Sequence, residues 1–213
     1  MTPIVKKSLS EQIYEDLRHR ILAQEITFGE KLTNRDLQAH YGVSSTPVRD
    51  AVNFLHRDGL VEYPTRTGAR VITFDLKHAL DINEVLSILG VSAIRLSAQR
   101  AKRAEVASRL ESILDKQESN IGNDSYYDYD QEFHSTFFEH SGNEQLRSIY
   151  TQYHMLHEML VRCYHRVQDT RDLAVKEHRR IYEAYSKGDF ELACKYMREH
   201  YKAAEAILGA VLK

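Results

Sequence analysis

The chain has 213 residues, which is enough for one large domain or two small ones. Its 42% apolar and 28% charged residues are typical of a folded protein with an ordinary core, and they exclude a disordered or collagen-like chain. The formal net charge of -2 excludes a polycation that coats nucleic acid nonspecifically, although a local basic face could still read DNA.

The sequence predicts neither a membrane span nor a secretion signal. It contains no run of about eighteen apolar residues, and its first residues lack the apolar stretch and cleavage site of a signal peptide. The two cysteines form no CxxC motif, which fits a reducing compartment. We therefore expect a cytoplasmic protein with no membrane partner.

Residues 9–55 carry the pattern of three helices. Apolar residues recur at three- and four-residue spacing over 9–22, which predicts an amphipathic helix. A short helix over 33–40 and a longer one over 44–55 should follow, because hydroxyl or amide side chains stand where each would begin. Gly42 marks a tight turn between these two helices.

A β-hairpin is expected after the third helix. The short stretches 60–61 and 71–74 are β-prone, and residues 63–68 between them contain a proline and a glycine that suit a turn. Three helices followed by such a wing form a winged helix-turn-helix, which we assign to residues 1–74.

From Asp75 onward the helical period predominates and strand signals are absent. Glycines at 122, 142 and 188 mark helix ends with short connections, which favour antiparallel packing. The expected helices cover residues 75–100, 103–121, 125–140, 143–167, 170–187 and 189–211. The predicted fold class is thus mainly α, with an all-α six-helix bundle over 75–213 after the winged domain.

The start of the third helix has the chemistry of a DNA-reading surface. It reads Ser44-Ser45-Thr46-Pro47-Val48-Arg49, with short hydroxyl side chains and an arginine at a helix N-terminus. An ordinary capped helix could carry the same residues. The preceding helix and turn and the following wing favour the DNA-binding interpretation.

Four ligand-type residues are placed on inward helix faces of the bundle. Asp130 and His134 are four residues apart on a face rich in aromatic residues, and His178 and His200 each share a face with apolar neighbours. One carboxylate and three imidazoles suit a divalent ion: zinc first, with nickel or manganese as alternatives. Because the chain has 11 histidines, hydrogen-bonded core histidines are the competing interpretation.

The segment GEKLTNRDLQAHYGVSSTPVRDAVNFLHRDGLVEYPTRTGARV resembles the N-terminal signature of the GntR family of regulators. The resemblance covers about residues 9–73 and implies direct DNA contacts. It assigns these contacts to Arg35, Thr46, Arg49 and Gly68, with Ser44 and Ser45 assisting. Many relatives have arginine where this chain has Ser45, and Arg66 in the wing is a candidate to compensate.

The segments DYDQEFHSTFFEHSGN and EHRRIYEAYSKGDFELACKYMREH resemble the FCD effector domain of FadR-like GntR regulators. The resemblance implies a homodimer, a small organic acid as effector, and a metal held by Asp130, His134, His178 and His200. The first helix of this domain departs from the family pattern, because Leu86 and Gly90 stand where arginine and glutamate are common.

Arg162 is our candidate for binding an effector carboxylate through a charge-assisted hydrogen bond. Tyr126, Tyr153 and Tyr185 could line a cavity, although aromatic residues at helical spacing are commonly core filling. We therefore expect a repressor that binds double-stranded operator DNA and responds to a carboxylate bound near a metal. The alternatives are a metal-dependent hydrolase and a regulator whose metal is purely structural.

Overall fold

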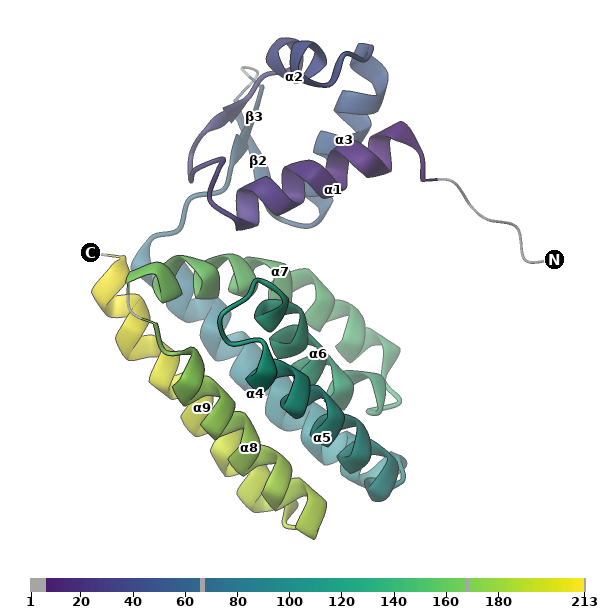
Figure 1. Ribbon diagram of the computed structural model, residues 1–213, viewed down its shortest axis with the longest axis vertical. Coiled ribbons are helices and arrows are strands. Elements are labelled where there is room, and N and C mark those ends of the chain that lie inside the picture. Colours follow the sequence, from purple (N-terminus) through teal and green to yellow (C-terminus); the bar gives the residue numbers. More distant parts are fainter. Residues whose placement is uncertain (1–6, 66–67, 168, 213) are drawn as a thin grey trace, which may run out of the picture. The chain divides into compact units, whose positions relative to one another are not determined.

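The computed structural model describes residues 7–65, 68–167 and 169–212 (Figure 1). The chain divides into two compact units, Met1–Phe74 and Asp75–Lys213, which we call the N-terminal and C-terminal units. None of the helices in the described ranges combines the length and the apolar character needed to cross a membrane.

The N-terminal unit holds a helix-turn-helix and a small antiparallel sheet, which confirms the predicted winged fold. Gly42 ends the second helix with a φ of +65°, a conformation that glycine adopts without steric cost. The elements are α1 (Leu9–Leu22), β1 (Lys31–Leu32), α2 (Asn34–Tyr41), α3 (Ser45–Arg57), β2 (Val61–Thr65) and β3 (Gly68–Val71).

The sheet differs in detail from the expected hairpin. It has the order β1-β3-β2, and the central strand β3 pairs with both neighbours. Because Ala69 and Arg70 already pair with β1, the ladder lies closer to the wing tip than the predicted strand over 71–74. Strand β1 has only two residues, too few to produce a periodic pattern in the sequence.

Helix α1 packs against α3 and closes the core of this unit. Ser8 caps α1 in a reciprocal arrangement with Glu11, since the Ser8 hydroxyl accepts from the Glu11 amide and Glu11 accepts from the Ser8 amide. Leu17 and Leu55 are fully buried between the helices. This apolar packing leaves the opposite, polar side of α3 toward solvent.

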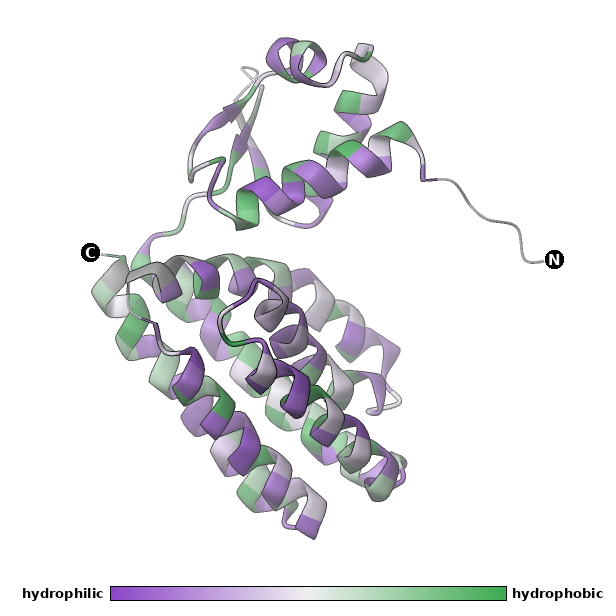
Figure 2. Cartoon of the chain, in the orientation of Figure 1, coloured by the Kyte–Doolittle hydropathy of each residue, from purple (hydrophilic) through white to green (hydrophobic). Residues whose placement is uncertain are grey.

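The C-terminal unit is an antiparallel bundle of six helices within the described residues, as predicted. Helix α6 packs on α4, α5 and α7, whereas α9 packs on α4 and α8. Figure 2 shows that each helix carries both hydrophobic and hydrophilic residues, the pattern expected of an amphipathic bundle. The helices are α4 (Leu76–Arg100), α5 (Arg103–Ser119), α6 (Ser125–Glu139), α7 (Glu144–Val167), α8 (Arg171–Lys187) and α9 (Phe190–Val211).

Candidate functional site

Three imidazoles from three helices meet inside the C-terminal unit. His134 of α6, His178 of α8 and His200 of α9 each offer a ligand atom, and these atoms lie within 4.8 Å of one another. The Nε2 atom of His178 lies 3.2 Å from Nε2 of His134 and 3.4 Å from Nε2 of His200. The structure therefore brings together the three histidines that the sequence analysis singled out.

Two further side chains fix how the imidazoles point. The Nδ1–H group of His178 donates to Gln117 Oε1 over 3.0 Å, and that of His200 donates to Glu177 Oε2 over 2.7 Å. A carbonyl or carboxylate oxygen can only accept, so both rings carry their proton on Nδ1. In the neutral rings, the Nε2 lone pairs therefore face the centre of the cluster.

Asp130 lies beside the histidines but is held by the same glutamine. Gln117 Nε2 donates to Asp130 Oδ1 over 3.0 Å, and this oxygen is 3.9 Å from His178 Nε2. Since the Asp130 carboxylate accepts from Nε2, it fixes the orientation of the Gln117 amide. That orientation in turn directs Oε1 to His178.

Burial sets the charge states around the cluster. It lowers the pKa of His134 and His178 well below the usual value, and His200 lowers both further. Burial also raises the pKa of Asp130 to about 6, partly offset by His200 and by the hydrogen bond from Gln117. The His134 and His178 rings are therefore neutral near pH 7 and can act as electron-pair donors.

The donor set fits a divalent metal ion. Donors that share one ion at bond lengths of about 2.1 Å lie about 3 to 4 Å apart. The distances from His178 Nε2 to His134 Nε2, His200 Nε2 and Asp130 Oδ1 are 3.2, 3.4 and 3.9 Å, which fall in that range. Lone pairs directed at one another repel unless a cation or proton lies between them. Metal-binding histidines usually donate their other ring N–H group to a carboxylate or carbonyl oxygen, as His178 and His200 do here.

A small pocket adjoins the cluster and shares two of its residues, Asp130 and His134. Its cavity is small, about 20 Å³, which is room for a group of about the size of one water molecule. The pocket combines hydroxyl, imidazole and carboxylate groups, which suits a small polar ligand. It is lined by Leu86, Tyr127, Asp130, Gln131, His134, Tyr150, His154, His157, Glu158 and Tyr201.

Arg162, the candidate for effector binding, is not among the described residues that line this pocket. Its Nε atom donates to Glu158 Oε1 over 2.9 Å, and its guanidinium lies 4.0 Å over the Tyr127 ring. The Arg162 side chain therefore contacts two lining residues without being part of the described lining. Tyr126 and Tyr185, the two cavity candidates with fully buried side chains, belong to the core instead.

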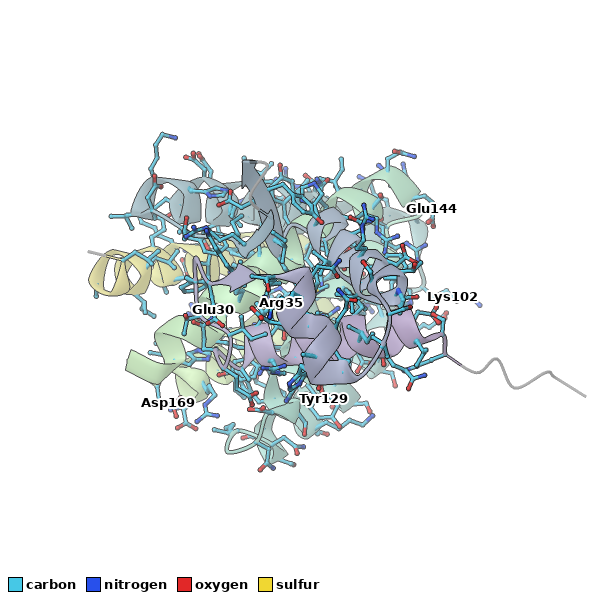
Figure 3. The ribbon with its side chains drawn as sticks, turned by 90° about the horizontal axis from the view of Figure 1, so that it is seen from above. Glu30, Arg35, Lys102, Tyr129, Glu144 and Asp169 are labelled. Carbon is cyan, nitrogen blue, oxygen red and sulfur yellow. The ribbon has the colours of Figure 1, made fainter. Side chains whose placement is uncertain are left out.

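In the N-terminal unit, several predicted DNA-binding residues are exposed on the helix-turn-helix. Arg35 lies on α2 (Figure 3), Thr46 and Arg49 lie on α3, and Ser44 precedes α3 without a side-chain capping bond. Ser45 is half-buried and accepts a 2.6 Å hydrogen bond from the Asn34 amide.

A groove between α3 and the sheet brings Arg49 and Gly68 together, whereas Arg35, Ser44 and Thr46 are outside its described lining. Gly68 has a φ of +111° at the start of β3. Arg66 lies outside the described residues. The groove is lined by Leu32, Thr33, Asn34, Val48, Arg49, Val52, Asn53, Tyr63, Gly68 and Ala69.

The sequence analysis did not identify the residues that support the cluster. Gln117 follows Leu110 and Ile113 on the buried face of α5, so the helical period could have marked it as an inward-facing amide. Glu177 immediately precedes His178 in the sequence, but nothing in the pattern indicates that it reaches His200 on another helix.

Two family models match the chain. The model described as "FCD domain" matches residues 81–203, and the model described as "Bacterial regulatory proteins, gntR family" matches residues 9–71. Together they cover both units.

Full-length relatives resemble the chain at moderate identity. The chain is 26% identical over 198 residues to the uncharacterized HTH-type transcriptional regulator YdhC of Bacillus subtilis, covering 89% of this chain and 86% of that protein. It is 27% identical over 234 residues to the HTH-type transcriptional repressor NanR of Cronobacter sakazakii, covering 98% and 88%.

A crystal structure of a GntR transcriptional regulator from Rhodococcus sp. RHA1 superposes with a TM-score of 0.77. Its sequence identity is 19%, and the match covers 96% of this chain and 99% of that chain. At this identity the similarity establishes the fold alone.

Proposed function

The chain belongs to the GntR family of bacterial regulatory proteins and carries an FCD domain, and we propose from this that it represses transcription in response to a small carboxylate. It is a DNA-binding transcriptional regulator and not an enzyme, so the hydrolase alternative is set aside. The name of the NanR relative, a transcriptional repressor, favours repression over activation. That name applies to the relative and supports the proposal by similarity.

The proposed DNA contacts begin at the N-terminus of α3. Thr46 and Arg49 are exposed there, where hydroxyl and guanidinium groups can reach base edges and phosphates in the major groove. Arg35, Ser44, Ser45, Arg66 and Gly68 complete the proposed surface. We propose that two copies of the chain bind the two halves of a pseudopalindromic operator, as expected for a homodimeric helix-turn-helix protein.

The proposed metal ligands are His134, His178, His200 and Asp130. Zinc is the first candidate because imidazole nitrogen and carboxylate oxygen are among its common ligands, whereas nickel and manganese remain alternatives. A bound divalent ion supplies a positive centre that can accept an oxygen ligand. The chain contributes the orientation, because Gln117 and Glu177 hold the Nε2 atoms of His178 and His200 toward the cluster.

We propose that the effector occupies the pocket beside this cluster and lowers the affinity for DNA. The pocket shares Asp130 and His134 with the proposed metal site, which favours a carboxylate at that end. Arg162 stays a proposed contributor, acting through its contacts with Tyr127 and Glu158. Such control requires that the effector bind the DNA-competent and DNA-incompetent arrangements with different affinities.

A purely structural metal is the second candidate function of the cluster. The histidines come from α6, α8 and α9, and an ion among them would tie three helices together. If the ion is only structural, chelation should lower the melting temperature equally with and without effector. If it belongs to the sensor, chelation should abolish the effect of the carboxylate on DNA affinity.

The exposed Arg49 at the start of α3 is the observation on which the DNA assignment depends most. Fluorescence anisotropy with DNA flanking the protein's own gene, at stated salt and with zinc present, tests it. We expect saturable binding that Arg49→Ala abolishes, whereas Arg147→Ala, which removes an exposed arginine of α7, should leave it intact. Equal binding by both variants would refute the proposed surface, and sedimentation of the same samples tests the dimer.

A further inference from the structure

The groove between α3 and the sheet of the N-terminal unit has the charge and the size to bind part of an anionic ligand. Its volume is about 520 Å³, within the range of small-ligand sites. Arg49 is the one charged side chain among the described residues that line it. Within the described part of the chain, no hydrogen bond or ion pair engages the Arg49 guanidinium. An uncompensated guanidinium in a lining without carboxylates favours an anion.

The second group that can bind an anion here is the Asn53 amide, which Tyr63 holds in place from the wing. Asn53 lies four residues after Arg49 and therefore on the same exposed face of α3. The Tyr63 hydroxyl donates to Asn53 Oδ1 over 3.1 Å, and its ring lies edge-on to the His56 ring with 5.0 Å between the centres. Because Oδ1 is engaged, the amide presents its two Nδ2–H donors, which no described residue uses.

A duplex bound as proposed would lay a backbone strand over this groove. The proposed contacts include α3 on one side of the groove and Gly68 of the wing on the other. A helix in the major groove is bordered by the sugar–phosphate strands that form the edges of that groove. The strand that runs between α3 and the wing therefore passes Arg49 and Asn53. An asparagine that reads adenine uses Oδ1 and Nδ2 together, and the Tyr63 hydroxyl already occupies Oδ1, which favours a phosphate.

We propose that Asn53, oriented by the Tyr63 hydroxyl, binds a backbone phosphate beside Arg49 and so fixes the position of α3 on the duplex. The inference rests on the proposed function, in which α3 enters the major groove, and it adds two residues to the DNA surface. Phosphates occur at every step of a duplex and carry no sequence information, so this contact raises the affinity for all DNA alike. Tyr63 is a positioning residue, because its hydroxyl acts through Asn53.

The test uses full-length, zinc-loaded protein and an operator that the wild type selects from a library of random duplexes. Fluorescence anisotropy at fixed salt compares the affinity for this operator with that for an unrelated duplex of the same length. Asn53→Ala should weaken binding to both about tenfold, as expected for the loss of one hydrogen bond to a charged group. Asn123→Ala removes an exposed asparagine of the C-terminal unit and should change neither affinity.

Two outcomes of this comparison overturn the inference. An unchanged affinity in folded Asn53→Ala shows that the residue contacts no DNA. A loss confined to the operator shows that Asn53 reads a base and not a phosphate. Asn53→Asp is a second variant, because it keeps the acceptor for Tyr63 but removes the donors and adds a negative charge. It should bind both duplexes more weakly than Asn53→Ala, since like charges oppose each other across an interface.

Neutral methylphosphonates, placed at one operator phosphate at a time, locate the contact. One position that weakens wild-type binding should cost Asn53→Ala at least about fivefold less, because both changes remove the same hydrogen bond. If no position shows this coupling, the phosphate assignment is wrong.

Tyr63→Phe tests the positioning role, because it keeps the ring beside His56 and removes only the hydroxyl. It should weaken binding to both duplexes less than Asn53→Ala does, and it should add nothing when the two changes are combined. Losses that multiply in the double variant refute a role of Tyr63 through Asn53. Circular dichroism and urea denaturation of each variant separate these effects from misfolding.

Failure of the proposed function can be told apart from failure of this inference. If the wild type selects no duplex above nonspecific binding, the assignment as a sequence-specific DNA reader is wrong, and the phosphate contact inferred from it is wrong too. If the wild type selects an operator that Arg49→Ala fails to bind but both Asn53 variants bind normally, the proposed function stands and only the inference is refuted.

Discussion

Gln117 is the residue through which the orientation of the proposed metal ligands can be tested. Its side chain is fully buried on α5, where it accepts from His178 Nδ1 and donates to Asp130 Oδ1. Gln117→Met preserves the length and approximate volume of the side chain and removes both hydrogen bonds. The substitution leaves His134, His178 and His200 unchanged, so any loss of metal affinity is attributable to orientation.

The expected size follows from what Gln117 does. Without it, the His178 ring can rotate or carry its proton on Nε2, and one Nε2 lone pair no longer faces the cluster. Loss of such an outer partner typically lowers metal affinity about 10- to 100-fold, or about 1.4 to 2.7 kcal/mol. In the metal-free protein, a buried His178 Nδ1–H left without a partner should cost about 1 to 3 kcal/mol of unfolding free energy.

Competition with a chromophoric chelator measures zinc affinity, and urea denaturation of the chelated protein measures stability separately. Gln145→Met, at an exposed position of α7, is the matched control and should change neither quantity. If folded Gln117→Met binds zinc as tightly as wild type, the tautomer argument is wrong. The three histidines would then be held in place by packing alone.

Three further substitutions test other parts of the structure. Gly68→Val should destabilise the N-terminal unit by about 1 to 3 kcal/mol and weaken DNA binding, because the backbone φ of Gly68 is +111°. Gly122→Val is the control in the same denaturation and anisotropy assays, since Gly122 has no neighbour within 4 Å and no positive φ. Burial and the hydrogen bond to Asp58 raise the pKa of Tyr14 to about 12. This contact therefore stabilises the fold fully when the pH is below the unfolded-state pKa of about 10, and less as the pH rises through 12. The difference in unfolding free energy between wild type and Tyr14→Phe should therefore shrink between pH 8 and 12, and a constant difference would contradict the assignment. Phe133→Ala should cost about 3 to 5 kcal/mol in urea denaturation, since its ring is fully buried and stacked on His178 at 4.3 Å; a cost below about 1 kcal/mol would show that this packing contributes little.

The helices could be predicted because their information is local. Apolar residues at three- and four-residue spacing mark a buried face whatever lies opposite, so the predicted and observed boundaries of the bundle helices differ by at most two residues. The inward positions of His134, His178 and His200 follow from the same period. That their Nε2 atoms converge is a property of helix packing. The sequence analysis inferred this convergence from the inward helix faces, and the family resemblance supported it.

The pocket could not be predicted because adjacent positions on one helix face different neighbours. The sequence analysis considered Tyr126 as a cavity residue, but Tyr126 is fully buried in the core, and the next residue, Tyr127, lines the pocket. A helical step of one residue rotates the side chain by about 100°, so the choice between them depends on where α7 packs. Likewise, no local pattern indicates that Arg162 contacts Glu158 and Tyr127 while lying outside the pocket lining.

Among the described residues, helix α4 supplies only apolar packing to this pocket. Leu86 is the α4 residue in the pocket lining, and it is apolar and buried. At Gly90, one turn further on, an added Cβ would be in ordinary van der Waals contact with Met197 at 3.4 Å and with Tyr201 at 3.5 Å, so α9 packs closely on α4 there. With α4 supplying only packing, the charged groups that line the pocket come from α6 and α7.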